Sequence, residues 1–230
     1  MKPSKVYFTD MRVHGENLPD KLIALARAAG IENIDFADKY VAIKVHFGEV
    51  GNLAFLRPDY ARALVRLIRE LGGKPFVTDC STLYVGARKN ALDHLDVAYA
   101  HGYNPLCLEC HTIIADGLKG TDEALIPIDC EYVKTAKIGR AIADADIIIS
   151  LNHFKGHEGT GFGGALKNLG MGLGSTAGKR AMHCDGKPVV DHNKCVGCGR
   201  CIGHCNFDAI RNNNFNAGEL LNRKMAEYAK

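Results

Sequence analysis

The stretch YVAIKVHFGEVGNLAFLRPDYARALVRLIRELGGKPFVTDC, residues 40–80, decides the fold. Its two ends, 40–47 and 74–80, are rich in β-branched and other apolar residues and predict strands. Between them, residues 57–73 predict a helix, with proline in the first turn and two glycines at the end. Four large apolar side chains recur on one face of that helix: Leu64, Leu67, Ile68 and Leu71. A strand, a helix and a second strand in this order are typical of an α/β sheet.

The same alternation continues in both directions along the chain. Strands are expected at 5–10 and 146–154, and helices at 18–30 and 87–102. Residues 146–154 include a continuous apolar run, which predicts a buried central strand. The sequence therefore predicts an α/β fold, with a mainly parallel sheet that carries helices on both faces.

Composition and charge exclude several classes of protein. The chain has 230 residues, of which 47% are hydrophobic and 24% charged, so a packed core is expected rather than disorder. The net charge is only +3, and no basic run is interleaved with aromatic residues, so nucleic acid is not an expected partner. No apolar stretch is long enough for a signal peptide or a membrane span, and a cytoplasmic location is the default expectation.

A second motif, CVGCGRCIGHCNFDAI at 195–210, has the C-x2-C-x2-C-x3-C spacing of a bacterial ferredoxin. The spacing predicts a 4Fe–4S cluster, with four candidate ligands: Cys195, Cys198, Cys201 and Cys205. Zinc is the alternative metal, but zinc ribbons separate their two CxxC pairs by a longer loop. The fourth ligand stays open, because the last cysteine of such a run binds the other cluster in two-cluster ferredoxins. Either Cys205 or a cysteine elsewhere, such as Cys184, completes the site.

Three parts are expected along the chain. Residues 1–185 form the α/β domain, residues 186–212 form a small ferredoxin-like 4Fe–4S segment, and residues 213–230 form a helix. That last helix shows no stop signal before the sequence ends, which predicts that it begins a truncated C-terminal part.

Polar side chains and glycines follow the predicted strand 146–154. The candidate catalytic residues in this stretch are His153, Lys155, His157 and Lys167. The candidate cofactor contacts are Gly161, Gly163, Gly164 and Asn168. In open α/β sheets, ligands bind at the carboxyl ends of the strands, and backbone amides beside a helix start can hold an anion. We therefore expect a binding site at this strand end.

Two other predicted strands end in a similar way. The strand 40–47 carries Lys44 and His46 as candidate catalytic residues, with Glu49 as a candidate cofactor contact, and Asp79 at the end of 74–80 is a further one. If these strands are parallel, their polar ends meet at one edge of the sheet. Lysines there would bind anionic groups, and histidines would bind a metal or move protons. An additional metal ion or a small anionic ligand is therefore expected at this edge.

These stretches resemble the domain-of-unknown-function 362 family. The resemblance rests on KVHFGEVGN, on VTDCSTLY followed by an arginine, on a histidine at position 94, and above all on HFKGHEGTGFGGALKNLGMG. Family members join such a domain to ferredoxin-type cysteine runs and usually continue beyond them. The resemblance implies that nine residues match the polar signature of the family: Lys44, His46, Glu49, Asp79, His153, Lys155, His157, Lys167 and Asn168. A fainter likeness of arrangement, with His and Lys at strand ends beside glycine loops, is to the lactate-racemase type of domain.

Three functions are consistent with these features. The leading hypothesis is a cytoplasmic iron–sulfur oxidoreductase or electron-transfer protein, which exchanges electrons with a redox partner protein or a small-molecule substrate. The second is a non-redox, metal-dependent enzyme of a racemase-like kind, in which the cluster is structural. The third is an assembly module that hands a cluster or a metal to a partner. The sequence does not fix the oligomeric state.

Overall fold

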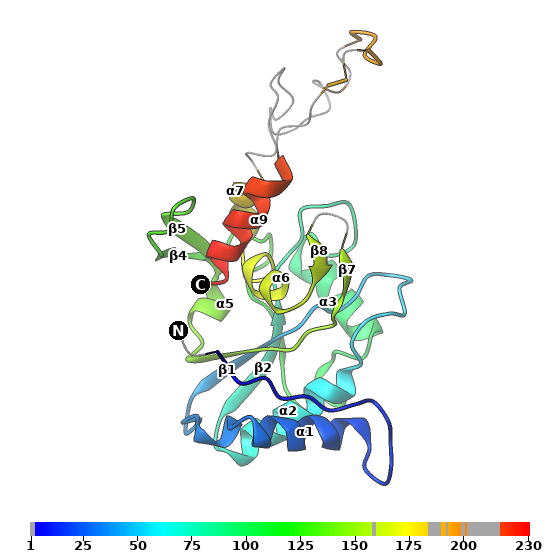
Figure 1. The fold of residues 1–230 in the computed structure, drawn as a ribbon, viewed down its shortest axis with the longest axis vertical. Coiled ribbons are helices and arrows are strands. Elements are labelled where there is room, and N and C mark those ends of the chain that lie inside the picture. Colours follow the sequence, from blue (N-terminus) through cyan, green and yellow to red (C-terminus); the bar gives the residue numbers. More distant parts are fainter. Residues whose placement is uncertain (1–2, 158–159, 184–189, 192, 199–200, 202–216) are drawn as a thin grey trace.

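A computed structural model describes residues 3–157, 160–183, 190–191, 193–198, 201 and 217–230. Its centre is a sheet of four parallel strands in the order β3-β2-β1-β6 (Figure 1). The strands are β1 (Tyr40–Lys44), β2 (Lys74–Asp79), β3 (Thr112–Ile114) and β6 (Ile147–Ser150). The predicted α/β fold with a parallel sheet is confirmed.

The register of the sheet brings the strand ends level with one another. Lys44 of β1 pairs with Thr78 on one side and with Ser150 on the other. Asp79, the next residue of β2, pairs with Ile114 at the end of β3. Polar residues that lie far apart in the sequence therefore share one carboxyl edge.

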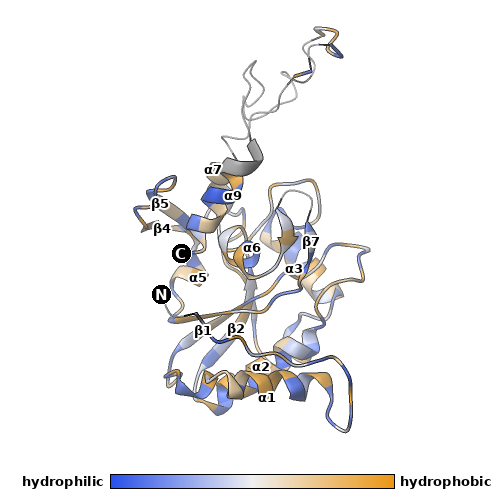
Figure 2. Cartoon of the chain, in the orientation of Figure 1, coloured by the Kyte–Doolittle hydropathy of each residue, from blue (hydrophilic) through white to orange (hydrophobic). Residues whose placement is uncertain are grey.

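Helices α2 (Pro58–Glu70) and α1 (Leu18–Ala28) form two layers beside the sheet. The apolar face of α2 packs with Val41 and Ile43 of β1, which are fully buried, and α1 packs on α2. Helix α1 carries both hydrophobic and hydrophilic residues (Figure 2), and its Leu22 and Ile23 pack against the core. Helix α3 (Ala91–Ala100) follows β2, and its N-cap Asn90 accepts a hydrogen bond from the backbone N–H of Asp93.

A second hydrophobic core lies beside the sheet. It is built by the antiparallel pair β4 (Glu123–Pro127) and β5 (Thr135–Gly139) together with several helices. These helices are α5 (Arg140–Ala143), α6 (Ala165–Gly170), α7 (Thr176–His183) and α9 (Ala217–Tyr228). Met225 and Tyr228 of α9 are buried in this core, and α9 packs against α6 and α7. The helix predicted near the end of the sequence is thus part of the folded body.

Four further short elements are described. The 3-10 helix η1 (Ile31–Asn33) follows α1, and α4 (Pro105–Leu108) precedes β3. The strands β7 (Lys155–His157) and β8 (Gly161–Gly163) form a separate two-stranded hairpin. No helix among the described residues is long and apolar enough to cross a membrane.

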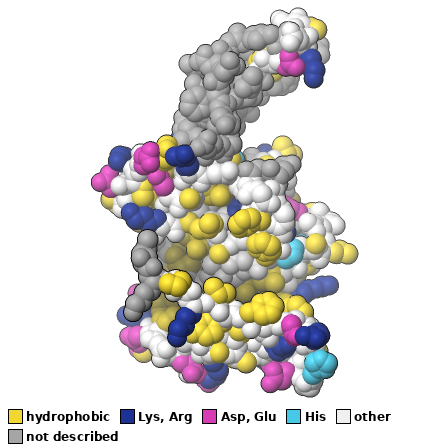
Figure 3. Space-filling model, in the orientation of Figure 1, with side chains coloured by type: hydrophobic (Ala, Val, Ile, Leu, Met, Phe, Trp, Pro, Cys, Tyr) yellow, Lys and Arg dark blue, Asp and Glu magenta, His cyan; other side chains and the backbone are white. Residues whose placement is uncertain are grey.

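Two sequence predictions are wrong. Residues 5–10 form no strand, and the side chains of Val6 and Phe8 are 90% and 86% exposed. The strand predicted at 146–154 is the edge strand β6, not a central one. Its apolar run has another cause: Ile147 and Ile149 pack against the core, while Ile148 lines an apolar groove of about 350 Å³. Hydrophobic side chains gather around a hollow on the face shown in Figure 3.

Close packing between α6 and α9 gives a test of this arrangement. A Cβ atom on Gly170 would lie 2.0 Å from the backbone oxygen of Met225, so Gly170→Ala should lower the free energy of unfolding by about 1–3 kcal/mol. Gly156→Ala is the control, because a Cβ on Gly156 meets nothing within 4 Å. Urea unfolding of both variants measures the difference. Equal stability of the two variants would contradict the packing of α9 described above.

Candidate functional site

Lys44 lies at the carboxyl edge of the sheet with its side chain inside the protein, only 1% exposed. Its Nζ lies 3.0 Å from Oδ1 of Asp79 and 2.9 Å from Oδ1 of Asn168. Asp79 ends β2, and Asn168 belongs to α6, so three elements meet at this ammonium group. A charge removed from water needs such partners. The structure therefore brings together three of the residues singled out in the sequence.

The side-chain amide of Asn168 ties two strand ends together. Its Nδ2 donates to the backbone oxygen of Lys44 at 3.1 Å and to Oγ of Ser150 at 3.0 Å. Glycine at position 172 lets the chain after α6 lie close to the side chain of Lys44, because a Cβ there would lie 2.7 Å from Nζ of Lys44. Helix α6 is thus fixed against β1 and β6 by one polar side chain.

The second oxygen of Asp79 faces two further buried side chains. Arg88, from the loop before α3, places Nη1 3.1 Å from Oδ2 of Asp79, and His94 of α3 places Nε2 3.7 Å from it. The side chains of Arg88 and His94 are 1% and 0% exposed. One carboxylate therefore serves two buried cations, Lys44 and Arg88. We call Lys44, Asp79, Arg88, His94 and Asn168 the edge cluster.

Arg88 connects the edge cluster to the surface. Its Nη2 lies 2.9 Å from Nε2 of His46 and donates to the carboxylate of Glu49 and the hydroxyl of Tyr84. The side chains of His46 and Glu49 are 54% and 34% exposed, and Tyr84 is 53% exposed. His46, Glu49 and Tyr84 form what we call the mouth of the site. These partly exposed side chains lie between Arg88 of the edge cluster and solvent.

Burial and charge set the ionisation of Asp79 and Lys44. Burial opposes ionisation of Asp79, but the ammonium of Lys44 and the guanidinium of Arg88 hold the pKa of its carboxyl well below its usual range. Burial lowers the pKa of Lys44, and Asp79 limits that fall. An ammonium whose pKa is lowered at a strand end is suited to hold or transfer a proton.

Both histidines of the site are neutral at physiological pH. Burial, with Arg88 as a further cause, lowers the pKa of His94 to about 3. Packing around its ring and the charge of Arg88 lower the pKa of His46 to about 4. Nδ1 of His46 accepts the backbone N–H of Gly48 at 3.0 Å, so the single proton of the neutral ring is on Nε2, which lies 3.9 Å from Oε1 of Glu49. Neutral imidazoles can accept protons or bind metals.

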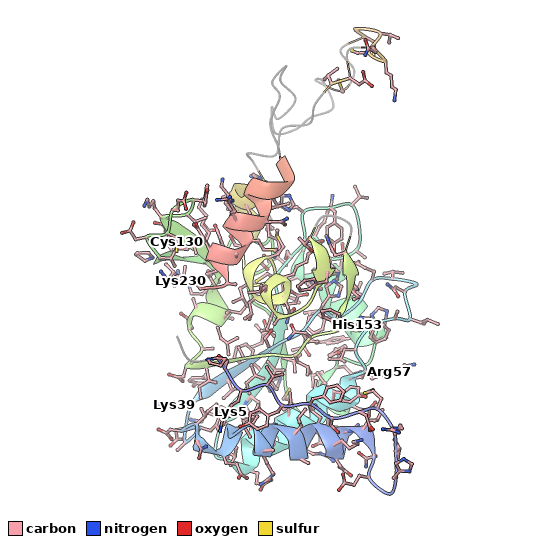
Figure 4. The ribbon with its side chains drawn as sticks, viewed as in Figure 1. Lys5, Lys39, Arg57, Cys130, His153 and Lys230 are labelled. Atoms are coloured by element: carbon pink, nitrogen blue, oxygen red, sulfur yellow. The ribbon has the colours of Figure 1, made fainter. Side chains whose placement is uncertain are left out.

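The other predicted residues lie on and beside the β7–β8 hairpin. Lys167 of α6 hydrogen-bonds Nε2 of His157, and His153 and Lys155 are exposed (His153 is labelled in Figure 4). The three glycines shape this region: Gly161 has φ of +76° in β8, Gly163 is buried, and Gly164 precedes α6. Lys167 precedes Asn168 of the edge cluster in α6, so this helix carries a residue of the edge cluster and one that contacts the hairpin.

The candidate cluster ligands Cys195, Cys198 and Cys201 are exposed free thiols. The backbone N–H of Gly197, which has φ of +69°, donates to Sγ of Cys195 at 3.4 Å. A backbone N–H directed at a cysteine sulfur in a tight loop fits the needs of an iron–sulfur ligand. Cys184 and Cys205 lie outside the described residues. Within the part of the chain that is described, no three His, Cys, Asp or Glu side chains converge as a metal site.

Arg88, His94 and Tyr84 belong to the site and lie in the motifs that carry the family resemblance, but they were not chosen as candidate site residues. A buried carboxylate such as Asp79 requires cations, and that requirement was the signal for Arg88, nine residues further along the chain. His94 stands on the buried face of α3 with Val97 and Ala98, where a histidine resembles an ordinary core residue. Only the folded structure shows that its Nε2 lies 3.7 Å from Oδ2 of Asp79.

Comparison with known proteins places these features in a family. Residues 41–230 match the family described as "Domain of unknown function (DUF362)". A curated relative, the thylakoid-associated protein sll1697 of Synechocystis sp. (strain ATCC 27184 / PCC 6803 / Kazusa), is 30% identical over 119 residues, which are 52% of this chain and 33% of the relative.

Among solved structures, the lactate racemase apoprotein from Thermoanaerobacterium thermosaccharolyticum is similar over 75% of this chain and 36% of its own, at 16% identity and a TM-score of 0.46. The chain thus matches about a third of the length of either protein.

Acid titration tests the placement of His94. Between about pH 6 and pH 4 an unfolded histidine binds a proton that the folded His94 does not, so the free energy of unfolding falls as the pH falls, by about 1.4 kcal/mol per pH unit for one such group. The variant His94→Gln should remove that part of the slope. Urea unfolding over this pH range measures it, and the exposed His111→Gln is the control. An unchanged slope in His94→Gln would show that His94 is not a buried neutral histidine.

Proposed function

This chain belongs to the DUF362 family, and we propose that it is an iron–sulfur protein whose 4Fe–4S cluster serves a small-molecule site at the carboxyl edge of the sheet. In this role it is an oxidoreductase or an electron-transfer protein, and a redox partner protein or a substrate exchanges electrons with the cluster. We place it in the cytoplasm, where thiolate ligands stay reduced. The cysteine run carries this proposal, because its spacing is that of a ferredoxin.

The described part of the cysteine run supports a cluster over zinc. Three exposed thiols separated by two residues each leave no room for the longer loop between pairs that zinc ribbons use. The N–H of Gly197 donates to the sulfur of Cys195, and such bonds stabilise thiolate ligands and tune the potential of a cluster. The donor set therefore fits Cys195, Cys198 and Cys201 as three ligands of one cluster, with Cys205 as the proposed fourth.

The edge cluster supports the second half of the proposal. Lys44, Asp79 and Arg88 bury two positive charges and one negative charge at the edge where α/β proteins bind ligands. A buried ion pair stabilises a protein no more than well-packed apolar side chains would. The presence of these charges at this edge therefore supports a functional role for them. In this proposal a small molecule reaches these groups from the side of His46, Glu49 and Tyr84, which are partly exposed.

A non-redox enzyme is the second candidate, and the ionisation of the edge cluster favours it. A lysine ammonium with a lowered pKa beside neutral histidines can give a proton to a substrate and take one back without any electron transfer. In that case the cluster would be structural. Reduction by dithionite separates the two candidates: an electron paramagnetic resonance signal of a reduced cluster supports the redox role, and a cluster that accepts no electron supports the non-redox one.

Anaerobic reconstitution with iron and sulfide tests whether the chain holds a cluster. We expect about four iron and about four sulfide ions per chain. Cys198→Ser should sharply lower both contents, because it removes a ligand in the middle of the run. Cys107→Ser is the matched control, since Cys107 is also an exposed free thiol but lies outside the run. Stoichiometric zinc without sulfide, or equal iron in both variants, would contradict the proposal.

A further inference from the structure

Charge does not balance within the buried part of the site. The side chains of Lys44 and Arg88 are each 1% exposed and share the carboxylate of Asp79, so one positive charge remains. His46 and His94 are neutral and do not change this sum. The carboxylate of Glu49 restores neutrality. It accepts a hydrogen bond from Nη2 of Arg88 and forms an ion pair with it. A partly solvent-exposed side chain thus supplies the counter-charge of a buried guanidinium.

Glu49 is held where the site meets solvent. Its carboxylate accepts from Arg88 and from the hydroxyl of Tyr84, and its own side chain is 34% exposed. Glu49 comes from the loop after β1, between Gly48 and Gly51, which both have positive φ. No core packing holds the neighbouring Val50, which is 71% exposed. Moving Glu49 into water therefore disturbs little besides the hydrogen bonds of its carboxylate.

The guanidinium of Arg88 is only partly used. Its Nε is buried and has no hydrogen-bond partner among the described residues, and the same holds for both ring nitrogens of His94. Nε and Nη2 of an arginine form a fork that matches the two oxygens of a carboxylate. Of these two donors, Glu49 pairs with Nη2 alone, and the N–H of Nε has no hydrogen-bond acceptor among the described residues. An unpaired buried donor costs free energy that a ligand could recover.

We propose that Arg88 binds the carboxylate group of a small-molecule ligand, and that Glu49 occupies this position as an internal stand-in that the ligand displaces. The ligand carboxylate takes both Nε and Nη2, and the hydroxyl of Tyr84 donates to it as it now donates to Glu49. Lys44 and His94 then lie deeper in the site, beside the rest of the molecule. This inference rests on the proposed small-molecule site at the sheet edge and names the chemical class that the site takes.

The closing experiment measures the melting temperature of the full chain, reconstituted anaerobically, against rising acetate, with equal concentrations of chloride as the ionic-strength control. A ligand of the folded state raises the melting temperature in proportion to the logarithm of its concentration over its Kd. Glu49→Gln removes the competing charge and should bind acetate at least about tenfold more tightly than the wild type. Glu109→Gln is the matched control, because Glu109 forms an exposed bidentate pair with Arg66 outside the site.

Each outcome decides the inference. Tighter acetate binding in Glu49→Gln alone supports it, and loss of that gain in the double variant with Arg88→Lys, which keeps the charge but not the fork, supports it further. Acetate binding no tighter in Glu49→Gln than in Glu109→Gln overturns it. Stabilisation by inorganic phosphate but not by acetate overturns the carboxylate class. Iron and sulfide contents of the same samples are read separately, so a chain that binds acetate without a cluster contradicts only the iron–sulfur proposal.

Discussion

The ion pair between Lys44 and Asp79 is the constraint around which the carboxyl edge of the sheet is built. Both side chains are removed from water, and each would cost several kcal/mol if it were left without its partner. The pair also accounts for the positions of two neighbouring side chains. Oδ1 of Asn168 accepts a hydrogen bond from the ammonium of Lys44, and the guanidinium of Arg88 pairs with the second oxygen of Asp79. Helix α6 and the loop before α3 are positioned by these contacts as much as by apolar packing.

A chain of alternating charges links this pair to the surface. It runs from Glu49 through Arg88 and Asp79 to Lys44, so neighbouring charges in the chain always have opposite signs. Such a chain couples events at the mouth to the ionisation of the deepest group, because removing the outer carboxylate leaves a positive charge uncompensated in a medium of low dielectric constant. A ligand that brings its own negative charge restores the balance. The geometry therefore connects binding at the surface with the proton state of Lys44.

Sequence reasoning found the ends of the strands but not the whole site. Lys44 and Asp79 were predicted because polar residues that end apolar strands of a parallel sheet share one edge. Arg88 and His94 were missed because neither follows a strand directly: one stands in an irregular loop, and the other lies on the buried face of α3. The error at 146–154 has a similar origin. An apolar groove and a core produce the same continuous apolar run, although β6 is an edge strand.

The sequence by itself determined the alternation of strands and helices, the amphipathic face of α2, and the spacing of the cysteine run, since each depends on residues close together in the chain. The tertiary structure alone decided the strand order and which charges share Asp79. The physical reason is the distance along the sequence between the residues that determine each feature. Periodicity and ligand spacing are local, whereas the pairing of buried charges depends on which distant segments the packed core brings within a few ångströms of each other.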